Sequence, residues 1–265
     1  MGYIGYERSR GVGIVTFSRP EAMNALCAEA LEECLRFFEE LGRRLSSDDE
    51  PEVHAVILTG AGRAFIAGAD VKEMREMSPS EAARFSARGN QLMTDIERLP
   101  VPVIAAVNGF ALGGGFEVAL AADFLYAAAD AKLGFPEVGL GIIPGFGGVR
   151  RLSQRIGPAR AKELIYTCRL VTGEEAFALG IANRAAPAEE LLGLAQQTAA
   201  LMDKAGHRAL EAAKRHVNEC ALLDDAAVAA IEPDRFGSLF AGTEPREGMT
   251  AMLEKRTPGW AGKDR

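Results

Sequence analysis

The sequence predicts an α/β fold built on a largely parallel sheet, followed by a helical C-terminal region. Two observations carry this prediction. Short runs rich in β-branched residues alternate with helical patterns through most of the chain, which is typical of α/β proteins with parallel strands. From about residue 189 the strand-like runs stop and alanine-rich helical patterns take over. We therefore expect an α/β core over residues 1–198 and a helical region over residues 199–265.

The N-terminal elements follow from local patterns. Residues 11–17 (GVGIVTF) predict a strand, because β-branched and aromatic residues are followed by Arg19-Pro20. Asn24 is then expected to cap a helix over residues 26–45, where apolar residues recur every three or four positions. Residues 53–59 (VHAVILT) predict the next strand.

The remaining elements continue the alternation. Residues 79–98 have a helical pattern, and the apolar run at 103–109 (VIAAVNG) is typical of a strand buried on both faces. Residues 124–128 (FLYAA) predict a fourth strand. The tail shows helical patterns over residues 191–202, 208–220 and 236–255.

Composition excludes several classes of protein. The 265 residues are 48% hydrophobic and carry a formal net charge of −7, which argues against disorder and against a nucleic-acid-binding protein. No apolar run approaches the roughly 20 residues that span a bilayer, and no signal-peptide pattern begins the chain. The four cysteines form no CxxC pair, so we expect reduced thiols, no metal site and a cytoplasmic protein.

Glycine is concentrated in one window. Ten of the 29 glycines lie between Gly109 and Gly148, where an even spread would place about four, and such crowding indicates sharp turns or close backbone approach. No P-loop fits, because no Gly-Lys pair is followed by Ser or Thr. No dinucleotide fingerprint fits either, because Pro144 stands where the third glycine of GxGxxG should be. No histidine lies between residues 55 and 206, so a Ser-His or Cys-His nucleophile in this window lacks its base.

Carboxylates and backbone amides remain as candidate groups. The run from Gly113 to Glu117 follows a buried strand and opens a helix, where free N–H groups and the helix dipole can hold a developing oxyanion. Glu117 either acts in such a site or merely complements the dipole. Glu137 is either a second functional acid or an ordinary surface acid after Pro136. The segment 64–70 is either a plain turn or presents another free N–H, at Ala69.

Together these segments resemble the crotonase superfamily, and enoyl-CoA hydratases most closely. The resemblance covers nearly the whole chain and rests on five stretches, namely RPEAMNAL (19–26), FIAGADVKEM (65–74), NGFALGGGFEVALAADF (108–124), FPEVGLGIIPGFGG (135–148) and LFAGTEPREGMTAMLEKR (239–256). It implies a spiral of ββα units with a C-terminal helical region for trimerisation and for covering the acyl pocket.

The resemblance also implies a reaction, the reversible syn addition of water to trans-2-enoyl-CoA thioesters in fatty-acid or related acyl-CoA degradation. The thioester carbonyl is expected between the N–H groups of Ala69 and Gly114, which stabilise an enolate-like state. Glu117 is expected to act as the base that takes the proton of water, and Glu137 as the acid that protonates the α-carbon. No metal or redox cofactor is implied, and coenzyme A enters as part of the substrate.

Further contacts are implied by the same resemblance. The adenine end of coenzyme A is expected near residues 67–72, a phosphate at Lys255, the acyl chain at Phe240, and the reacting groups close to the backbone of Gly113 and Gly145. Within the first range the expected contacts are Ala67, Gly68, Asp70, Val71 and Lys72. The implied partners are the acyl-CoA thioester substrate and further copies of the chain, in a trimer or a dimer of trimers, with no nucleic acid and no membrane.

Some features depart from this pattern or stand outside it. Phe116, Phe146 and Val149-Arg150 replace residues more usual in hydratases, which puts the acyl-chain preference in doubt. Residues 138–162 contain five basic residues and no acid. We expect this stretch to be a solvated helix face, with phosphate steering as the alternative.

Three other activities compete with hydration. An enoyl-CoA isomerase typically manages with one acid at the position of Glu137, so the presence of Glu117 favours a hydratase. Dehalogenation in this superfamily would need an Asp nucleophile and a His, which the histidine gap disfavours. An RNA-binding or scaffolding relative would need neither glutamate. Such a relative would be expected to have a longer run of lysines on one helix than this chain has.

Overall fold

Two sheets form the centre of the molecule. The computed structural model describes residues 2–47 and 53–260. The larger sheet has the strand order β1-β2-β3-β5-β7-β10, and the smaller has the order β4-β6-β8-β9. All neighbouring strands are parallel except β1 with β2 and β8 with β9, as expected for a largely parallel α/β fold. The strands are β1 (Ile4–Ser9), β2 (Val12–Phe17), β3 (Ala55–Gly60), β4 (Ala64–Ile66), β5 (Val103–Val107), β6 (Phe110–Leu112), β7 (Phe124–Ala128), β8 (Lys132–Gly134), β9 (Val171–Thr172) and β10 (Arg184–Ala186).

Consecutive strands alternate between the two sheets. In the pairs β3–β4, β5–β6 and β7–β8, the first strand joins the larger sheet and the second joins the smaller one. Each pair leads into a helical segment, so the chain forms three successive ββα units. The corners between the sheets are tight, because a Cβ at Gly60 or Gly109 would lie 2.1 Å from the carbonyl oxygen of Ala64 or Arg63. Glycine is therefore needed at both corners.

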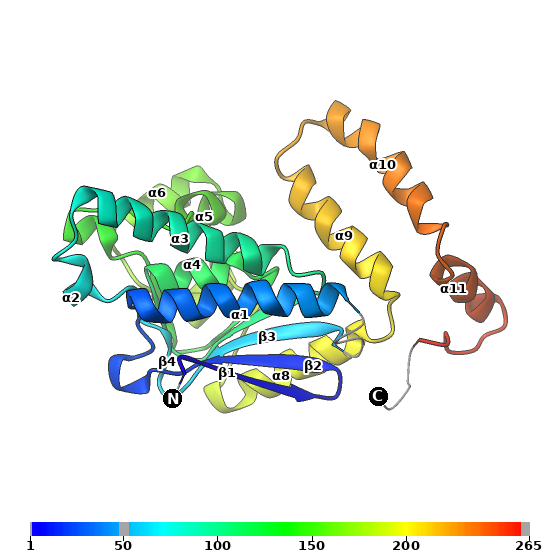
Figure 1. Ribbon diagram of the computed structural model, residues 1–265, viewed down its shortest axis with the longest axis horizontal. Coiled ribbons are helices and arrows are strands. Elements are labelled where there is room, and N and C mark those ends of the chain that lie inside the picture. The colour runs from blue at the N-terminus through cyan, green and yellow to red at the C-terminus, as the bar shows by residue number, and fades with distance from the viewer. Residues whose placement is uncertain (1, 48–52, 261–265) are drawn as a thin grey trace.

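Helices cover both faces of the larger sheet. Helix α1 packs against α3, and α8 packs against β2, β3, β5, β7 and β10; in Figure 1 the strands lie between α1 and α8. The helices of the core are α1 (Ala28–Ser46), α2 (Val71–Met74), α3 (Pro79–Glu97), α4 (Gly114–Ala121), α5 (Gly148–Ile156), α6 (Pro158–Thr167), α7 (Gly173–Leu179) and α8 (Ala188–Met202), with 3-10 helices η1 (Pro20–Ala22) and η2 (Glu137–Leu140).

The expected helix cap at Asn24 is wrong. Helix α1 begins at Ala28, and Cys27 accepts the capping N–H of Ala30. The buried Asn24 has a left-handed backbone instead. Its side-chain amide donates to the carbonyl oxygens of Ala61, Ala64 and Phe65. Asn24 therefore links the segment before α1 to the corner between β3 and β4 by hydrogen bonds.

The C-terminal region consists of helices that extend away from the core (Figure 1). They are α9 (His207–Cys220), α10 (Asp225–Leu239) and α11 (Glu244–Leu253). The single helix expected over residues 236–255 is in fact the end of α10 and all of α11, separated by a turn at Gly242. The expected division at residue 198 falls within α8, and both expected ranges include residues outside the described ones. Among the described residues, no helix is long and apolar enough to cross a membrane.

Candidate active site

Three parallel strands of the smaller sheet end at one edge. Ile66 of β4 pairs with Ala111 of β6, and Leu112 of β6 pairs with Gly134 of β8. The segments that follow these strands are 67–72, 113–117 and 135–137. Because parallel strands have their carboxyl ends on the same side, the sheet brings the three predicted segments together.

Glu117 lies in the first turn of α4 and is buried. Its Oε1 accepts hydrogen bonds from the N–H groups of Phe146 and Gly148, each 2.7 Å long. Burial raises the pKa of Glu117, while these N–H groups and the positive charge of Arg151 oppose that rise. A side chain that merely complemented the helix dipole would not need two donors from another segment. Glu117 is therefore held in a polar pocket inside an apolar core.

Glu137 begins η2 and is only 8% exposed, so the alternative of an ordinary surface acid is wrong. Its Oε2 has no hydrogen-bond partner among the described residues. Burial raises the pKa of Glu137 to about 7, and the nearby negative charge of Glu117 adds to the rise. A Cβ at Gly113 would lie 2.5 Å from Glu137 Oε1, so the glycine before α4 leaves room for this carboxyl group.

Two backbone N–H groups near the carboxyl groups are free. The amides of Ala69 and Gly114 donate to no other residue in the described part of the chain. Ala69 pairs with Leu26 as an isolated bridge in which Leu26 N donates to Gly68 O and Asp70 N donates to Leu26 O, both over 2.9 Å. This pattern turns the N–H of Ala69 away from Leu26. A Cβ at Gly114 would lie 3.8 Å from Leu26 Cδ1, so both free amides lie close to Leu26.

The residues after Ala69 have different environments. Asp70 accepts the N–H of Lys72 as the cap of α2 and forms an ion pair of 3.0 Å with Arg19. The hydrogen bond from Arg19 holds the pKa of Asp70 below its usual range. Val71 and Lys72 are exposed. Asp70 therefore fixes the turn, while its two neighbours face solvent beside the site.

The loop from Gly145 to Gly148 is anchored by residues that local patterns did not single out. Gly145 O accepts hydrogen bonds from Ser86 Oγ over 2.6 Å and from Asn90 Nδ2 over 2.8 Å, both on α3. Neither residue has a sequence signal, because the contacts span 59 and 55 positions. The loop thereby keeps its N–H groups on Glu117.

The basic stretch over residues 138–162 is only partly a solvated face. Arg160 and Lys162 are exposed as expected. Arg151 is buried, with 6% exposure, and forms an ion pair with Glu97. Arg155 is half-buried and donates to the carbonyl oxygen of Ala122. For Arg151 and Arg155, the expectation of a solvated face is therefore wrong.

Phe240 and Lys255 lie far from the two glutamates in this chain. Phe240 follows α10, is about half exposed and packs against Phe236 with ring centres 5.3 Å apart. Lys255 is exposed just after α11. In Figure 1, helices α10 and α11 lie beyond α9, away from α4, which carries Glu117. The chain alone does not bring these two residues to the site.

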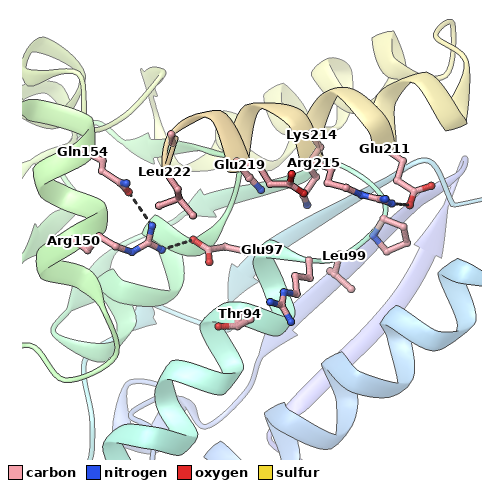
Figure 2. Close-up of a pocket in the computed structure, with 14 residues that line it drawn as sticks. Thr94, Glu97, Leu99, Arg150, Gln154, Glu211, Lys214, Arg215, Glu219 and Leu222 are labelled. Atoms are coloured by element: carbon pink, nitrogen blue, oxygen red, sulfur yellow. Dashed lines mark hydrogen bonds and ion pairs between the residues drawn. The ribbon is translucent and has the colours of Figure 1, made fainter. Parts of the chain in front are cut away.

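A cavity of about 590 Å³ lies between α9 and the ends of α3 and α5. Figure 2 shows its charged walls, with Glu97 and Arg150 on the core side and Lys214 and Arg215 on α9. Neither glutamate of the site lines this cavity. The cavity therefore lies between helix α9 and Glu97 at the end of α3, outside the pocket that holds the two glutamates.

Comparisons with known proteins show which family this chain is similar to. The family described as enoyl-CoA hydratase/isomerase matches residues 7–263. The crotonyl-CoA hydratase of Syntrophomonas wolfei is 42% identical over 258 residues, covering 97% of each chain. The short-chain-enoyl-CoA hydratase of Clostridium acetobutylicum is 41% identical over 94% of each chain. The crystal structure of enoyl-CoA hydratase from Bacillus anthracis has a TM-score of 0.91 at 36% identity, covering 98% of this chain and all of that one. The two-sheet core with its C-terminal helices is thus the crotonase fold.

Proposed function

We propose that this chain, which belongs to the enoyl-CoA hydratase/isomerase family, is a hydro-lyase that adds water reversibly to trans-2-enoyl-CoA thioesters. The product is a 3-hydroxyacyl-CoA, formed by syn addition. The observation that carries the proposal is the pair of buried carboxyl groups, Glu117 and Glu137, beside two free backbone N–H groups. Family membership and relatives named as hydratases at about 40% identity support it.

The free amides of Ala69 and Gly114 suit a thioester oxygen. When water adds to C3 of the enoyl group, negative charge moves through the conjugated system onto this oxygen. Two preorganised donors stabilise the charge, and losing one such donor typically costs about 2.7–4 kcal/mol. The chemistry neither oxidises nor reduces the substrate, so the proposal needs no redox cofactor.

The two carboxyl groups have environments that divide the proton transfers. Glu117 accepts two N–H bonds and faces Arg151, which favour its ionised form. Glu137 has a pKa of about 7 and an unpartnered oxygen, which suits a group that carries a proton. We therefore assign Glu117 as the base that activates water and Glu137 as the acid that protonates C2.

Phe146 favours short acyl chains. Its buried ring lies 3.1 Å from where a Cβ of Gly114 would be, and its N–H contacts Glu117. The ring therefore fills space beside Gly114, one of the two proposed donors to the thioester oxygen. We propose crotonyl-CoA and other short enoyl thioesters as the substrate class, within fatty-acid or related acyl-CoA degradation.

The remaining contacts depend on coenzyme A and on assembly. The exposed Val71 and Lys72, with Ala67, Gly68 and Asp70, remain the proposed place for the adenine end. Phe240 and Lys255 remain proposed contacts to acyl chain and phosphate, which requires a different arrangement of the C-terminal helices or a neighbouring copy. Exposed apolar residues on these helices support a trimer or dimer of trimers, among them Phe236, Met252 and Leu253. The four free cysteines are consistent with a cytoplasmic protein.

One assay tests the proposal directly. Purified protein mixed with crotonyl-CoA should remove the ultraviolet absorbance of the conjugated enoyl thioester. A control with a 3-enoyl-CoA should show no gain of that absorbance. The reverse result, no hydration but conversion of the 3-enoyl thioester into the conjugated isomer, would assign an isomerase instead.

A further inference from the structure

Arg151 connects Glu97, at the end of α3, to the loop from Gly145 to Gly148 whose N–H groups contact Glu117. It lies on α5, and its guanidinium forms a fork with Glu97, in which Nε donates to Oε1 over 2.7 Å and Nη2 donates to Oε2 over 2.9 Å. The remaining Nη1 donates to the carbonyl oxygen of Phe146 over 2.9 Å. The N–H of that same Phe146 donates to Glu117. One buried cation thus fixes the residue that contacts the catalytic carboxylate.

The loop between these contacts is built around the guanidinium. Gly147 has a φ of +89°, and a Cβ there would lie 2.6 Å from Arg151 Nη1. A side chain at this position would displace the guanidinium or strain the backbone. With the glycine, the loop curls around Arg151 and directs the N–H groups of Phe146 and Gly148 at the same oxygen of Glu117. The glycine at position 147 therefore leaves the space that the Arg151 guanidinium occupies.

We propose that the Glu97–Arg151 pair is a positioning device for hydration, which holds the Phe146 and Gly148 amides on Glu117 and thereby keeps Glu117 ionised as the base. The proposal rests on the proposed function, since it assigns a cause to the role of Glu117 there. Neither Arg151 nor Glu97 is placed in contact with substrate. Both act through the loop.

Few charged groups act on Glu117. Arg151 from α5 favours its ionised form, and Glu137 from η2 opposes it. The strands packed on α4, which are β4, β5, β6 and β7, contain no Asp, Glu, Lys, Arg or His. The buried face of α3 consists of Gly89, Leu92, Met93 and Ile96. Arg151 is therefore the cation whose loss most directly affects Glu117, through its charge and through the two amides.

Arg150 provides a matched control. It is the preceding residue on α5, carries the same charge and contacts the same Glu97 oxygen, at 3.4 Å. It is about half exposed and otherwise contacts Gln154, as Figure 2 shows. Among the described residues its side chain forms no hydrogen bond with the loop from Gly145 to Gly148. Arg150→Met and Arg151→Met therefore remove the same charge, but only the second removes the donor to Phe146.

The experiment compares pH profiles of crotonyl-CoA hydration for the wild type and both variants. Loss of Arg151 should raise the pKa of Glu117, so the acid limb of kcat should move to higher pH by about one unit. Near neutral pH kcat should fall about tenfold or more, with a smaller change in KM. Arg150→Met should change kcat less than about threefold and leave the limb in place. Superimposable profiles for the two variants would overturn the proposal.

Two additions keep the test decisive. If circular dichroism shows that Arg151→Met is unfolded, Arg151→Lys is tested in its place. Its acid limb should also lie at higher pH than that of Arg150→Met. Equal profiles for these two variants would again overturn the proposal. An infrared titration of the carboxyl band, assigned with Glu117→Gln, measures the protonation of Glu117 without any turnover. A wild type that hydrates nothing would refute the proposed function, whereas an unshifted Glu117 band in the Arg151 variant would refute the positioning role alone.

Discussion

At the scale of single residues, Glu117 and Glu137 are the same type of residue in two different environments. Glu117→Gln and Glu137→Gln keep the size of the side chain and remove the ionisable proton. Each should lower kcat for crotonyl-CoA hydration by at least about 10²-fold, since each removes one proton-transfer group. Thermal unfolding of both variants serves as the control for an intact fold. Near-full activity in either variant would contradict the role given to that residue.

Glu137 also makes the fold pH-dependent. Because its pKa is raised from 4.5 to about 7 in the folded protein, its ionisation destabilises the fold as pH rises from about 4.5 to 7. Above this window the effect is fully present, on the order of 3 kcal/mol. Glu137→Gln should therefore raise the free energy of unfolding at pH 8 relative to wild type, and change it little at pH 4. Urea unfolding at the two pH values measures this, and an equal effect at both would refute the raised pKa.

At the scale of elements, helix α3 contains a glycine that its neighbour requires. Gly89 lies in the middle of α3, where glycine typically costs about 1 kcal/mol relative to alanine. A Cβ at this position would lie 2.0 Å from Cδ1 of Phe146. Gly89→Ala should thus destabilise the fold by about 1–3 kcal/mol through overpacking, despite its better helix propensity.

The double variant Gly89→Ala/Phe146→Ala separates the clash from other effects. With the ring removed, the added methyl group should be neutral or stabilising relative to Phe146→Ala alone. Urea unfolding of the four proteins gives the coupling between the two positions. Additive effects would show that Gly89 and Phe146 do not compete for the same space.

The same scale explains which parts could be predicted from sequence. The patterns predict β2, β3, β5 and β7 and the helix that begins at Gly114, but they miss the six-residue strand β1. The motif resemblance indicates both glutamates. The three-residue strands β4, β6 and β8 are too short for an alternating pattern to indicate them. Arg151 and Glu97 are 54 positions apart, so only the folded chain shows that they meet. The local pattern predicts a helix cap at Asn24 because the actual partners of its side chain belong to a corner some 40 residues away.

At the scale of the whole molecule, a largely buried ion pair connects the C-terminal helices to the core. Lys214 of α9 lies 3.0 Å from Asp123, and its Nζ also donates to the carbonyl oxygen of Val101. Burial lowers the pKa of Lys214 and raises that of Asp123, and their attraction opposes both shifts. Two desolvated charges of this kind stabilise an arrangement only while both are present.

Lys214→Met should therefore loosen the attachment of α9 by leaving Asp123 buried without its partner, at about 3–5 kcal/mol. The neighbouring Arg215 is a matched control, because it is exposed and pairs with Glu211 on its own helix, so Arg215→Met should change stability by less than about 1 kcal/mol. Limited proteolysis between α8 and α9, at residues 203–206, reports the attachment directly, and should accelerate only for Lys214→Met. Adding Asp123→Asn to Lys214→Met should restore part of the protection, since the carboxylate charge that lost its lysine partner is then removed. Equal cleavage rates for the two single variants would mean that other contacts hold the C-terminal helices.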